Sequence, residues 1–270
     1  MDLRGASAES VTVLSSELET AVSGPGVPAG AVADSLFAVA RTLRSEAALR
    51  RFVTDSSVPD EAKSGLIGQL FGGKIDEQAR ELVSSAVTRR WTRSVDIATG
   101  IEHLGEIAAV RSAGSEIERL GDELFALRQA VQQNADLRDA LADPARSVSD
   151  KERLLEDLLA GRALPATVTL AKQSVSGTYR TVTVALGEYQ KVAASVQGEG
   201  VATVRVAKPL TEQDIARLSA GLTRQFGRPV HLNVVVDPEV LGGIKVEVGD
   251  HVIDGTIATR LDDARRALAG

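Results

Sequence analysis

The chain has 270 residues, enough for about two domains, and its 43% hydrophobic and 25% charged residues exclude a wholly disordered or collagen-like protein. Its 31 basic residues against 37 acidic ones give a net charge of −6, which offers no general attraction to nucleic acid. The absence of cysteine excludes disulfides, thiolate metal sites and a cysteine nucleophile. No stretch approaches the roughly 18 apolar residues that span a bilayer, so we expect membrane association only through a partner.

The first two thirds of the chain contain a tandem repeat with a spacing of 88 positions. This spacing aligns the segment Asp34-Ser35-Leu36-Phe37-Ala38 with Asp122-Glu123-Leu124-Phe125-Ala126, and the match continues without a gap. Further matched pairs are Ala47/Ala135, Leu49/Leu137, Arg50/Arg138, Asp55/Asp143, Lys63/Lys151, Leu66/Leu154, Leu70/Leu158, Gly73/Gly161, Leu82/Leu170 and Trp91/Tyr179. Because the matched positions are mostly apolar ones that would face a core, the sequence predicts two copies of one domain.

Each copy has the period of amphipathic helices. Leu36, Val39, Ala40 and Leu43 recur at i, i+3, i+4 and i+7, which places them on one helical face. Gly, Pro, Ser and Asp residues separate the periodic segments and mark where helices stop and start. Further helices in the first copy are expected at about 46–54, 60–71 and 76–91.

One helix is expected to belong to both copies. The first helix of the chain, at about 7–22, has its counterpart at about 95–110, a stretch that should also close the first bundle. The sequence therefore predicts a first helical bundle at 1–112 and a second at 95–195, which share the helix at 95–110.

Beyond about residue 196 the period changes from helical to alternating, which is typical of half-buried strands. Between the first two strands, Thr211 precedes an acidic first turn as an N-cap, and Gly227 ends the helix. A last helix is expected from about Thr256. The alternating strand residues are Ala202, Val204 and Val206, then Leu232, Val234 and Val236, and finally Ile244, Val246 and Val248.

This pattern predicts a small α+β domain of order β-α-β-β-α at 196–270. The expected fold class is therefore mainly α, with tandem duplicated helical bundles followed by that domain.

The segment Gly68–Lys74 fits the spacing of a phosphate-binding loop as far as its lysine. Ile75, however, stands where a serine or threonine must hold magnesium, and the segment follows an amphipathic helix instead of a buried strand. We therefore expect a helix C-terminus with Gly72 or Gly73 in a left-handed conformation.

Other residues of chemical interest are scattered, so we expect no catalytic residues, no metal site and no cofactor. The three histidines, His103, His231 and His251, have no partner at metal-binding spacing. Asp237-Pro238 and Asp254 are expected to serve turns or caps. Arg89, Arg90 and Arg93 beside Trp91 form either a basic contact patch or a solvated helix end.

The C-terminal residues carry a more specific pattern. The segment Val234–Asp250, followed by Val252–Ile257 and Leu261, resembles the C-terminal signature of the delta subunit of F-type ATP synthase, a family also called the oligomycin-sensitivity-conferring protein. Asn134–Pro144 and Lys151–Leu155 resemble the helical domain of the same family. The signature positions are Asp237, Pro238, Leu241, Gly242, Gly243, Gly249, Asp250 and Asp254.

The resemblance covers about residues 95–270, and the extra helical copy makes the chain similar to the elongated delta subunits of actinobacteria. It implies a non-catalytic subunit of the peripheral stalk, which links the alpha/beta catalytic head to the b-subunit stalk. In that role the subunit lets the head resist rotor torque during proton-driven ATP synthesis.

In that family the helical domain grips N-terminal helices of the alpha subunits, and the C-terminal domain holds C-terminal helices of the b subunits. The resemblance therefore implies these two partners, no nucleic acid, no direct membrane insertion and a peripheral location at the cytoplasmic face of the plasma membrane.

By analogy with the family, a groove for a partner helix would lie on the first and fifth helices of each bundle. Candidate groove residues are Val11, Leu14, Leu18, Leu82, Val83 and Val87 in the first copy, and Ile97, Ile101, Leu104, Leu170 and Val175 in the second. Apolar residues at this spacing also build a bundle's own core, so both interpretations stay open, as does which copy grips the alpha subunit.

Two functions from other classes remain to be weighed. A helical-repeat adaptor would bind amphipathic helices of unrelated proteins in the two grooves. A nucleotide-binding enzyme would use Gly68–Lys74.

Overall fold

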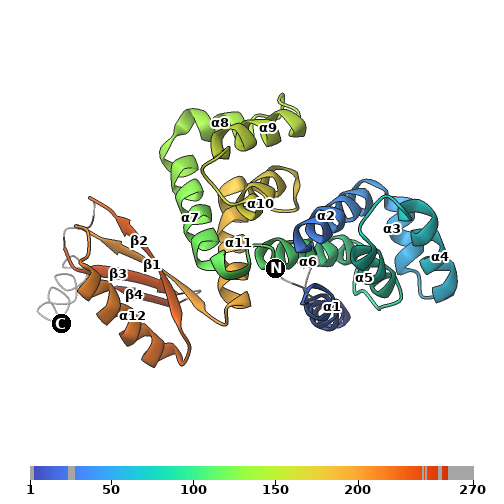
Figure 1. Ribbon diagram of the computed structural model, residues 1–270, viewed down its shortest axis with the longest axis horizontal. Coiled ribbons are helices and arrows are strands. Elements are labelled where there is room, and N and C mark those ends of the chain that lie inside the picture. Colours follow the sequence, from blue (N-terminus) through green and yellow to red (C-terminus); the bar gives the residue numbers. More distant parts are fainter. Residues whose placement is uncertain (1–2, 24–27, 239, 241, 249–250, 255–270) are drawn as a thin grey trace, which may run out of the picture. The chain divides into compact units, whose positions relative to one another are not determined.

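The computed structural model describes residues 3–23, 28–238, 240, 242–248 and 251–254 (Figure 1). The chain folds into two compact units, Met1–Ala193 and Ala194–Gly270. Within the described residues, the first unit is built from helices and the second combines a helix with a four-stranded sheet. The predicted fold class, tandem helical bundles followed by a small α+β domain, is confirmed.

The helical part of the chain contains eleven α-helices among the described residues, and the last of them crosses the boundary between the two units. A short 3₁₀ turn at Gly114–Glu116 precedes the seventh. The helices are α1 (Ala6–Val22), α2 (Ala29–Ser45), α3 (Ala47–Thr54), α4 (Asp60–Phe71), α5 (Glu77–Val87), α6 (Asp96–Arg111), α7 (Ile117–Gln133), α8 (Ala135–Ala142), α9 (Val148–Leu159), α10 (Pro165–Ser176) and α11 (Val182–Val196).

The helix bounds repeat with the spacing seen in the sequence. Helices α2 and α7 begin at Ala29 and Ile117, which are 88 positions apart, and both have 17 residues. The pairs α3/α8 and α4/α9 are displaced by the same spacing and have equal lengths of 8 and 12 residues. The tandem duplication of the helical bundle therefore extends from the residue pattern to the positions of the helices.

Helix α6 contacts helices of both halves of the helical unit. It contacts α1, α2, α3 and α5, which precede it in the chain, and also α7 and α10, which follow it. Twelve of its 16 residues are buried, whereas in the amphipathic helix α2 eight of 17 are. A helix enclosed on all sides cannot keep a polar face towards water, so its polar residues need partners inside the protein.

Because Met1–Ala193 forms one compact unit, the division of the helical part at 1–112 and 95–195 stays a prediction. The contacts of α6 with helices of both copies are the observation that supports a shared helix.

Two glycines let neighbouring aromatic rings reach the backbone of α6. A Cβ atom at Gly105 would lie 2.7 Å from the ring of Phe37 on α2, and one at Gly100 would lie 2.7 Å from the ring of Trp91. Glycine is less favourable than alanine in the interior of a helix, so both residues lower the intrinsic stability of α6. In return, the missing side chains leave room for the rings of Phe37 and Trp91.

Trp91 also explains a difference from the predicted helix at 76–91. Helix α5 ends at Val87, and the indole N–H of Trp91 donates a hydrogen bond of 2.9 Å to the carbonyl of Ala86. The chain turns back here so that the ring packs on α6, and a continuous helix would carry Trp91 away from that contact. Arg89 and Arg93 pair with Glu17 and Asp96, so most of this segment serves the bundle itself.

In the residues that the structure describes, the second unit is a sheet on which helix α12 packs. Its elements are β1 (Gly200–Val206), α12 (Glu212–Phe226), β2 (Val230–Val236), β3 (Ile244–Val248) and β4 (His251–Asp254), with strand order β2-β1-β3-β4. Strands β1 and β2 are parallel and joined through α12, whereas β3 is antiparallel to both β1 and β4.

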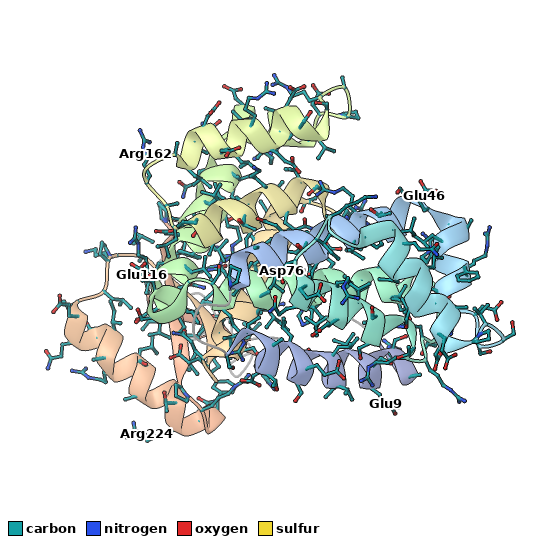
Figure 2. All side chains as sticks on the ribbon, turned by 45° about the vertical axis from the view of Figure 1, so that its right-hand side comes forward. Glu9, Glu46, Asp76, Glu116, Arg162 and Arg224 are labelled. Carbon is teal, nitrogen blue, oxygen red and sulfur yellow. The ribbon has the colours of Figure 1, made fainter. Side chains whose placement is uncertain are left out.

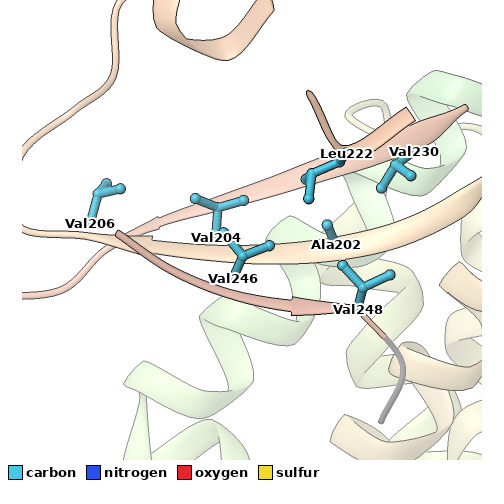
Figure 3. Close-up of a cluster of buried hydrophobic side chains, with 7 residues drawn as sticks. All are labelled: Ala202, Val204, Val206, Leu222, Val230, Val246 and Val248. Atoms are coloured by element: carbon cyan, nitrogen blue, oxygen red, sulfur yellow. The ribbon is translucent and has the colours of Figure 1, made fainter. Parts of the chain in front are cut away.

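The core of this unit is small and aliphatic. Alternate residues of three strands meet Leu222 of α12, as Figure 3 shows for Ala202, Val204, Val206, Val230, Val246 and Val248. Thr211 caps the start of α12 by accepting a hydrogen bond from the backbone N–H of Asp214, and Gly227 ends it with φ of 70°. These start and stop signals are the predicted ones.

One strand was not predicted, and one predicted helix cannot be compared. Strand β4 pairs with β3 through residues that show no clear alternation in sequence, and all four of its residues are exposed. The helix expected from about Thr256 lies outside the described residues.

Charged side chains cover the outside of the helical unit, as Glu9, Glu46 and Arg162 illustrate (Figure 2). Among the described residues, no helix combines the length and the hydropathy that crossing a membrane requires.

The close approach of Phe37 to α6 can be tested by replacing Gly105 with alanine. The new methyl group has no room beside the ring, so we expect the free energy of unfolding to fall by about 1–3 kcal/mol. Gly65→Ala on α4 is the matched control, because nothing lies within 4 Å of a Cβ there. Chemical denaturation should show this control gaining about 0.5–1 kcal/mol from helix propensity. A Gly105→Ala protein as stable as the control would contradict the packing described for α6.

Candidate functional site

The candidate groove residues lie inside the helical unit. Ten of the eleven are buried: Val11, Leu14, Leu18, Leu82, Val83, Val87, Ile97, Ile101, Leu104 and Leu170. The eleventh, Val175, is half-buried. Side chains that are almost fully covered by their own chain offer little surface to a partner helix, so they act as core in the isolated protein. Their use as a groove stays a prediction that requires the bundle to open.

The apolar side chains that remain exposed are different ones, and none of them is among the candidate groove residues. On the helical unit they are Val13, Phe52, Leu70, Val95, Val148, Leu158 and Val184. Leu70 on α4 and Leu158 on α9 occupy equivalent positions in the two copies and are 37% and 38% exposed. The duplicated bundle thus presents a leucine at the same place twice, which makes this position a candidate contact for partners.

The signature residues of the second unit that the structure describes lie around the connection from β2 to β3. The backbone N–H of Asp237 donates a hydrogen bond of 2.8 Å to the carbonyl of Val206, and its carboxylate lies 3.9 Å from Arg205. Gly242 and Gly243 have φ of 142° and 85°, which favours glycine. Pro238 follows β2, and Asp254 ends β4 opposite Lys245. Leu241, Gly249 and Asp250 lie outside the described residues.

The glycine-rich segment at 68–74 ends a helix, as the sequence predicts. Helix α4 stops at Phe71, Gly73 has φ of 68°, and the amino group of Lys74 donates to the carbonyl of Leu70. The equivalent Gly161 of the second copy has φ of 66°. A lysine bound to the carbonyl end of its own helix is not arranged to hold phosphate.

The most elaborate polar site in the helical unit surrounds Glu102 of α6, and we call it the α6 joint: Glu102, Arg44, Gln173, Ser176 and Thr178. The Glu102 side chain is 2% exposed and accepts a hydrogen bond of 2.5 Å from Arg44 of α2. It also accepts bonds of 2.8 Å from the Gln173 amide and 2.9 Å from the Thr178 backbone N–H. Four donors, counting the Thr178 hydroxyl, thus surround one buried carboxylate.

Arg44 completes this site from the other side. Its second guanidinium nitrogen donates a bond of 2.7 Å to the Ser176 carbonyl, and its first also reaches the Thr178 hydroxyl at 2.7 Å. Gly177 is required between these residues, because a Cβ there would collide with the Glu102 carboxylate. The α6 joint therefore ties α2 of the first copy to the end of α10 in the second.

One turn further along α6, Glu106 forms a second buried acidic site. Its carboxylate is 2.8 Å from the ring Nδ1 of His103 and also interacts with the Tyr179 hydroxyl. Burial raises the pKa of Glu106, although the hydrogen bond from His103 opposes the shift. Burial, followed by the charge of Glu106, raises the pKa of Tyr179 as well.

A cavity of about 280 Å³ adjoins these two carboxylates. Its lining includes Thr99, Glu102, His103, Glu106, Thr178 and Tyr179. Within the described parts of the chain, no three His, Asp or Glu side chains are arranged to hold a metal ion. The other two histidines, His231 and His251, lie on β2 and β4 of the second unit, and neither belongs to the lining of this cavity.

A larger cleft of about 660 Å³ separates α2 from α9 and α10. Phe37 and Arg41 line it on one side, and Glu152 and Leu159 line it on the other. Arg41 and Glu152 form an ion pair of 3.6 Å, whose arginine side chain is 52% exposed. Gln173 and Ser176 of the α6 joint also line the cleft, so the joint adjoins it.

Sequence reasoning missed the α6 joint, although one signal pointed to it. A helix predicted to serve two bundles must be enclosed, and the charged residues Glu102 and Glu106 within it therefore need internal partners. The partners themselves, from α2 and α10, follow only from the three-dimensional packing.

Comparisons with known proteins give a consistent result. The family model described as ATP synthase delta (OSCP) subunit matches residues 104–268. A protein of Nocardioides sp. (strain ATCC BAA-499 / JS614) named ATP synthase subunit delta is 55% identical over 272 residues, which cover 99% of this chain and 98% of the relative.

Proteins with the same name occur among more distant relatives. Those of Frankia casuarinae and Streptomyces coelicolor are 39% and 38% identical over 274 and 270 residues. These alignments cover 98% and 99% of this chain, and 99% and 98% of the relatives. The similarity therefore includes the first helical copy as well as the segment that the family model matches.

The raised pKa of Glu106 predicts how stability depends on pH. Above the ordinary carboxyl value of 4.5, the folded chain keeps a proton that the unfolded chain loses. The contribution of Glu106 to the free energy of unfolding therefore falls as pH rises, until the pH passes its pKa in the folded chain. Glu106→Gln removes this titration, so we expect the stability of the variant relative to wild type to increase as the pH rises above 4.5, as measured by urea denaturation.

The control for this experiment is Glu118→Gln, which removes an exposed carboxylate from α7. Its stability should follow that of the wild type at each pH. A stability difference between Glu106→Gln and wild type that does not change with pH would refute the assignment of a raised pKa.

Proposed function

Because the chain belongs to the ATP synthase delta (OSCP) subunit family, we propose that it is the subunit that links the catalytic head of an F-type ATP synthase to its peripheral stalk. The observation that carries this proposal is the 55% identity over nearly the whole length of a protein named ATP synthase subunit delta. The subunit is non-catalytic, and its contribution to the complex is mechanical.

The mechanical role follows from the torque that a turning rotor exerts on the head. A stalk must oppose this torque, which requires a stiff body and two durable contacts. The helical unit suits the first requirement, because α6 is enclosed by helices of both copies and large apolar residues are fully buried in it. A helix laid in a groove suits the second, since anchors at i, i+3, i+4 and i+7 resist sliding.

We assign the two partners to different parts of the chain. The helical bundles bind N-terminal helices of the alpha subunits, and the C-terminal unit binds C-terminal helices of the b subunits. The family model supports this division indirectly, because its match runs from α6 through α11 into the sheet. The second copy is therefore the family's ordinary helical domain, and the first copy is the addition.

The additional copy leaves a choice of where the alpha subunits are held. In the isolated chain the candidate groove residues of both copies are buried, so a partner helix must either displace a helix or use the exposed positions Leu70 and Leu158. We propose that the second copy makes the ordinary contact with the head and that the first copy extends the contact. Attachment to the cytoplasmic face of the plasma membrane then goes through the b subunits.

The two other functions are separated from this one by simple measurements. A free adaptor would bind helices of unrelated proteins and would be absent from purified ATP synthase. A nucleotide-binding enzyme would lose measurable affinity for ATP on Lys74→Ala, whereas the proposed subunit needs no such affinity and keeps full coupling in that variant. The bond from Lys74 to the Leu70 carbonyl favours the stalk subunit.

The proposed division of partners predicts the behaviour of a truncated chain. In pull-down and calorimetric titration, the full chain should bind both a peptide from the N-terminus of the alpha subunit and a peptide from the C-terminus of the b subunit. Deleting residues 197–270 keeps all of α11 and should weaken b-peptide binding at least about tenfold while alpha-peptide binding stays unchanged.

The helical circular-dichroism signal of the truncated chain is the control, since Met1–Ala193 forms a compact unit by itself. If the full chain retains neither peptide, the stalk proposal fails. If the truncated chain still binds the b peptide, the division of partners is wrong while the family membership is unaffected.

A further inference from the structure

The α6 joint connects parts of the chain that the duplication makes separate. Arg44 lies on α2 of the first copy, and Gln173 and Ser176 lie on α10 of the second. Glu102 lies on the helix between them and bonds to both sides. At the positions 88 residues further along, Arg44 and Glu102 are replaced by Gln132 and Gln190, so the repeat does not reproduce the joint. Its residues are therefore specific to the place where the two copies meet.

Few other polar contacts cross between α2 and the second copy in the described part of the chain. Arg41 and Glu152 pair across the mouth of the cleft, but their atoms are 3.6 Å apart and Arg41 is half exposed. Exposed pairs of this kind contribute little, because water and salt screen them. Glu102 is 2% exposed, so removing Arg44 would leave a buried carboxylate without its counter-charge.

The cleft defines the direction in which the two copies can separate. It lies between α2 on one side and α9 and α10 on the other, and Gln173 and Ser176 of the α6 joint belong to its lining. Helices α2 and α10 contact each other much less than α2 contacts α6, because the cleft lies between them. Movement of the two copies about α6 would open or close it.

We propose that the Glu102–Arg44 pair is a latch that fixes the angle between the two helical copies and makes them one rigid arm. The latch acts through the planar guanidinium group of Arg44. One of its nitrogens donates a hydrogen bond to the Glu102 carboxylate, and the other donates to the Ser176 carbonyl. Glu102 is thus a positioning residue for the second copy. When the latch is broken, each copy keeps its own core and the cleft widens.

The absence of cysteine from the chain allows a direct test in the full-length protein. Cysteines placed at Ala62 on α4 and Asp157 on α9, both exposed, can carry spin labels on the two copies without other reactive thiols. Pulsed electron–electron double resonance then measures the distribution of distances between the labels. In the wild-type background we expect one narrow distribution.

Glu102→Gln keeps the size of the side chain and removes its charge. We expect the distance distribution to broaden about twofold and to extend to longer distances, while the helical circular-dichroism signal stays at its wild-type value. Arg44→Lys keeps the charge but cannot bond both acceptors, so its distribution should be intermediate. Glu19→Gln, which breaks the Glu19–Arg111 pair between α1 and α6 of the first copy, is the matched control and should leave the distribution narrow.

The result that overturns the proposal is a wild-type distribution in Glu102→Gln with its helical signal intact. If Glu102→Gln loses helical signal, Arg44→Gln decides the matter, because the arginine is 25% exposed and its removal leaves Gln173 and Thr178 on the carboxylate. A broad distribution in a helical Arg44→Gln protein supports the latch, and a narrow one excludes it. Broadening in the Glu19→Gln control would show a general loss of rigidity and would also count against the latch.

Discussion

The helical unit depends on one constraint, which is that helix α6 is enclosed by helices from both copies of a duplicated bundle. An ordinary surface helix keeps one face for water, whereas α6 buries 12 of its 16 residues. Two features of its sequence accompany this enclosure. Glycines replace larger residues where Phe37 and Trp91 press against the backbone, and carboxylates are kept only where other helices supply donors. Phe37 and Trp91 belong to the first copy, whereas the donors to Glu102 come from both copies.

The enclosure also places carboxyl groups in the interior of the unit. A buried carboxylate lowers the free energy of unfolding unless it is hydrogen-bonded, paired with a positive charge or protonated. Glu102 and Glu106 lie one turn apart on the same helix, and their repulsion adds to the cost of burial. The protein meets this cost in two ways. It surrounds Glu102 with the guanidinium of Arg44 and three further donors, and it raises the pKa of Glu106. The first solution links helices from the two copies, and the second makes stability sensitive to pH.

Much of the fold could be predicted because local patterns and the repeat agree. Apolar spacing and start and stop signals gave the positions of α2, α3 and α4, and the 88-residue spacing then carried them to the second copy. Strand β4 was not predicted, because its four exposed residues show no alternation of polar and apolar positions. The α6 joint was not predicted, because Arg44, Glu102 and Gln173 are far apart in sequence and none of them belongs to a recognisable motif. The family signature in the tail, by contrast, depends on glycine conformations and turn residues that occur close together in the chain.

The constant spacing of the repeat has an architectural consequence. On the predicted division, α6 ends one copy and begins the next, so an additional copy would need five new helices instead of six. An additional copy would lengthen the chain by 88 residues, the spacing of the repeat. Helix α11 lies where a further copy would begin, so on this division the helical part would lengthen by whole modules.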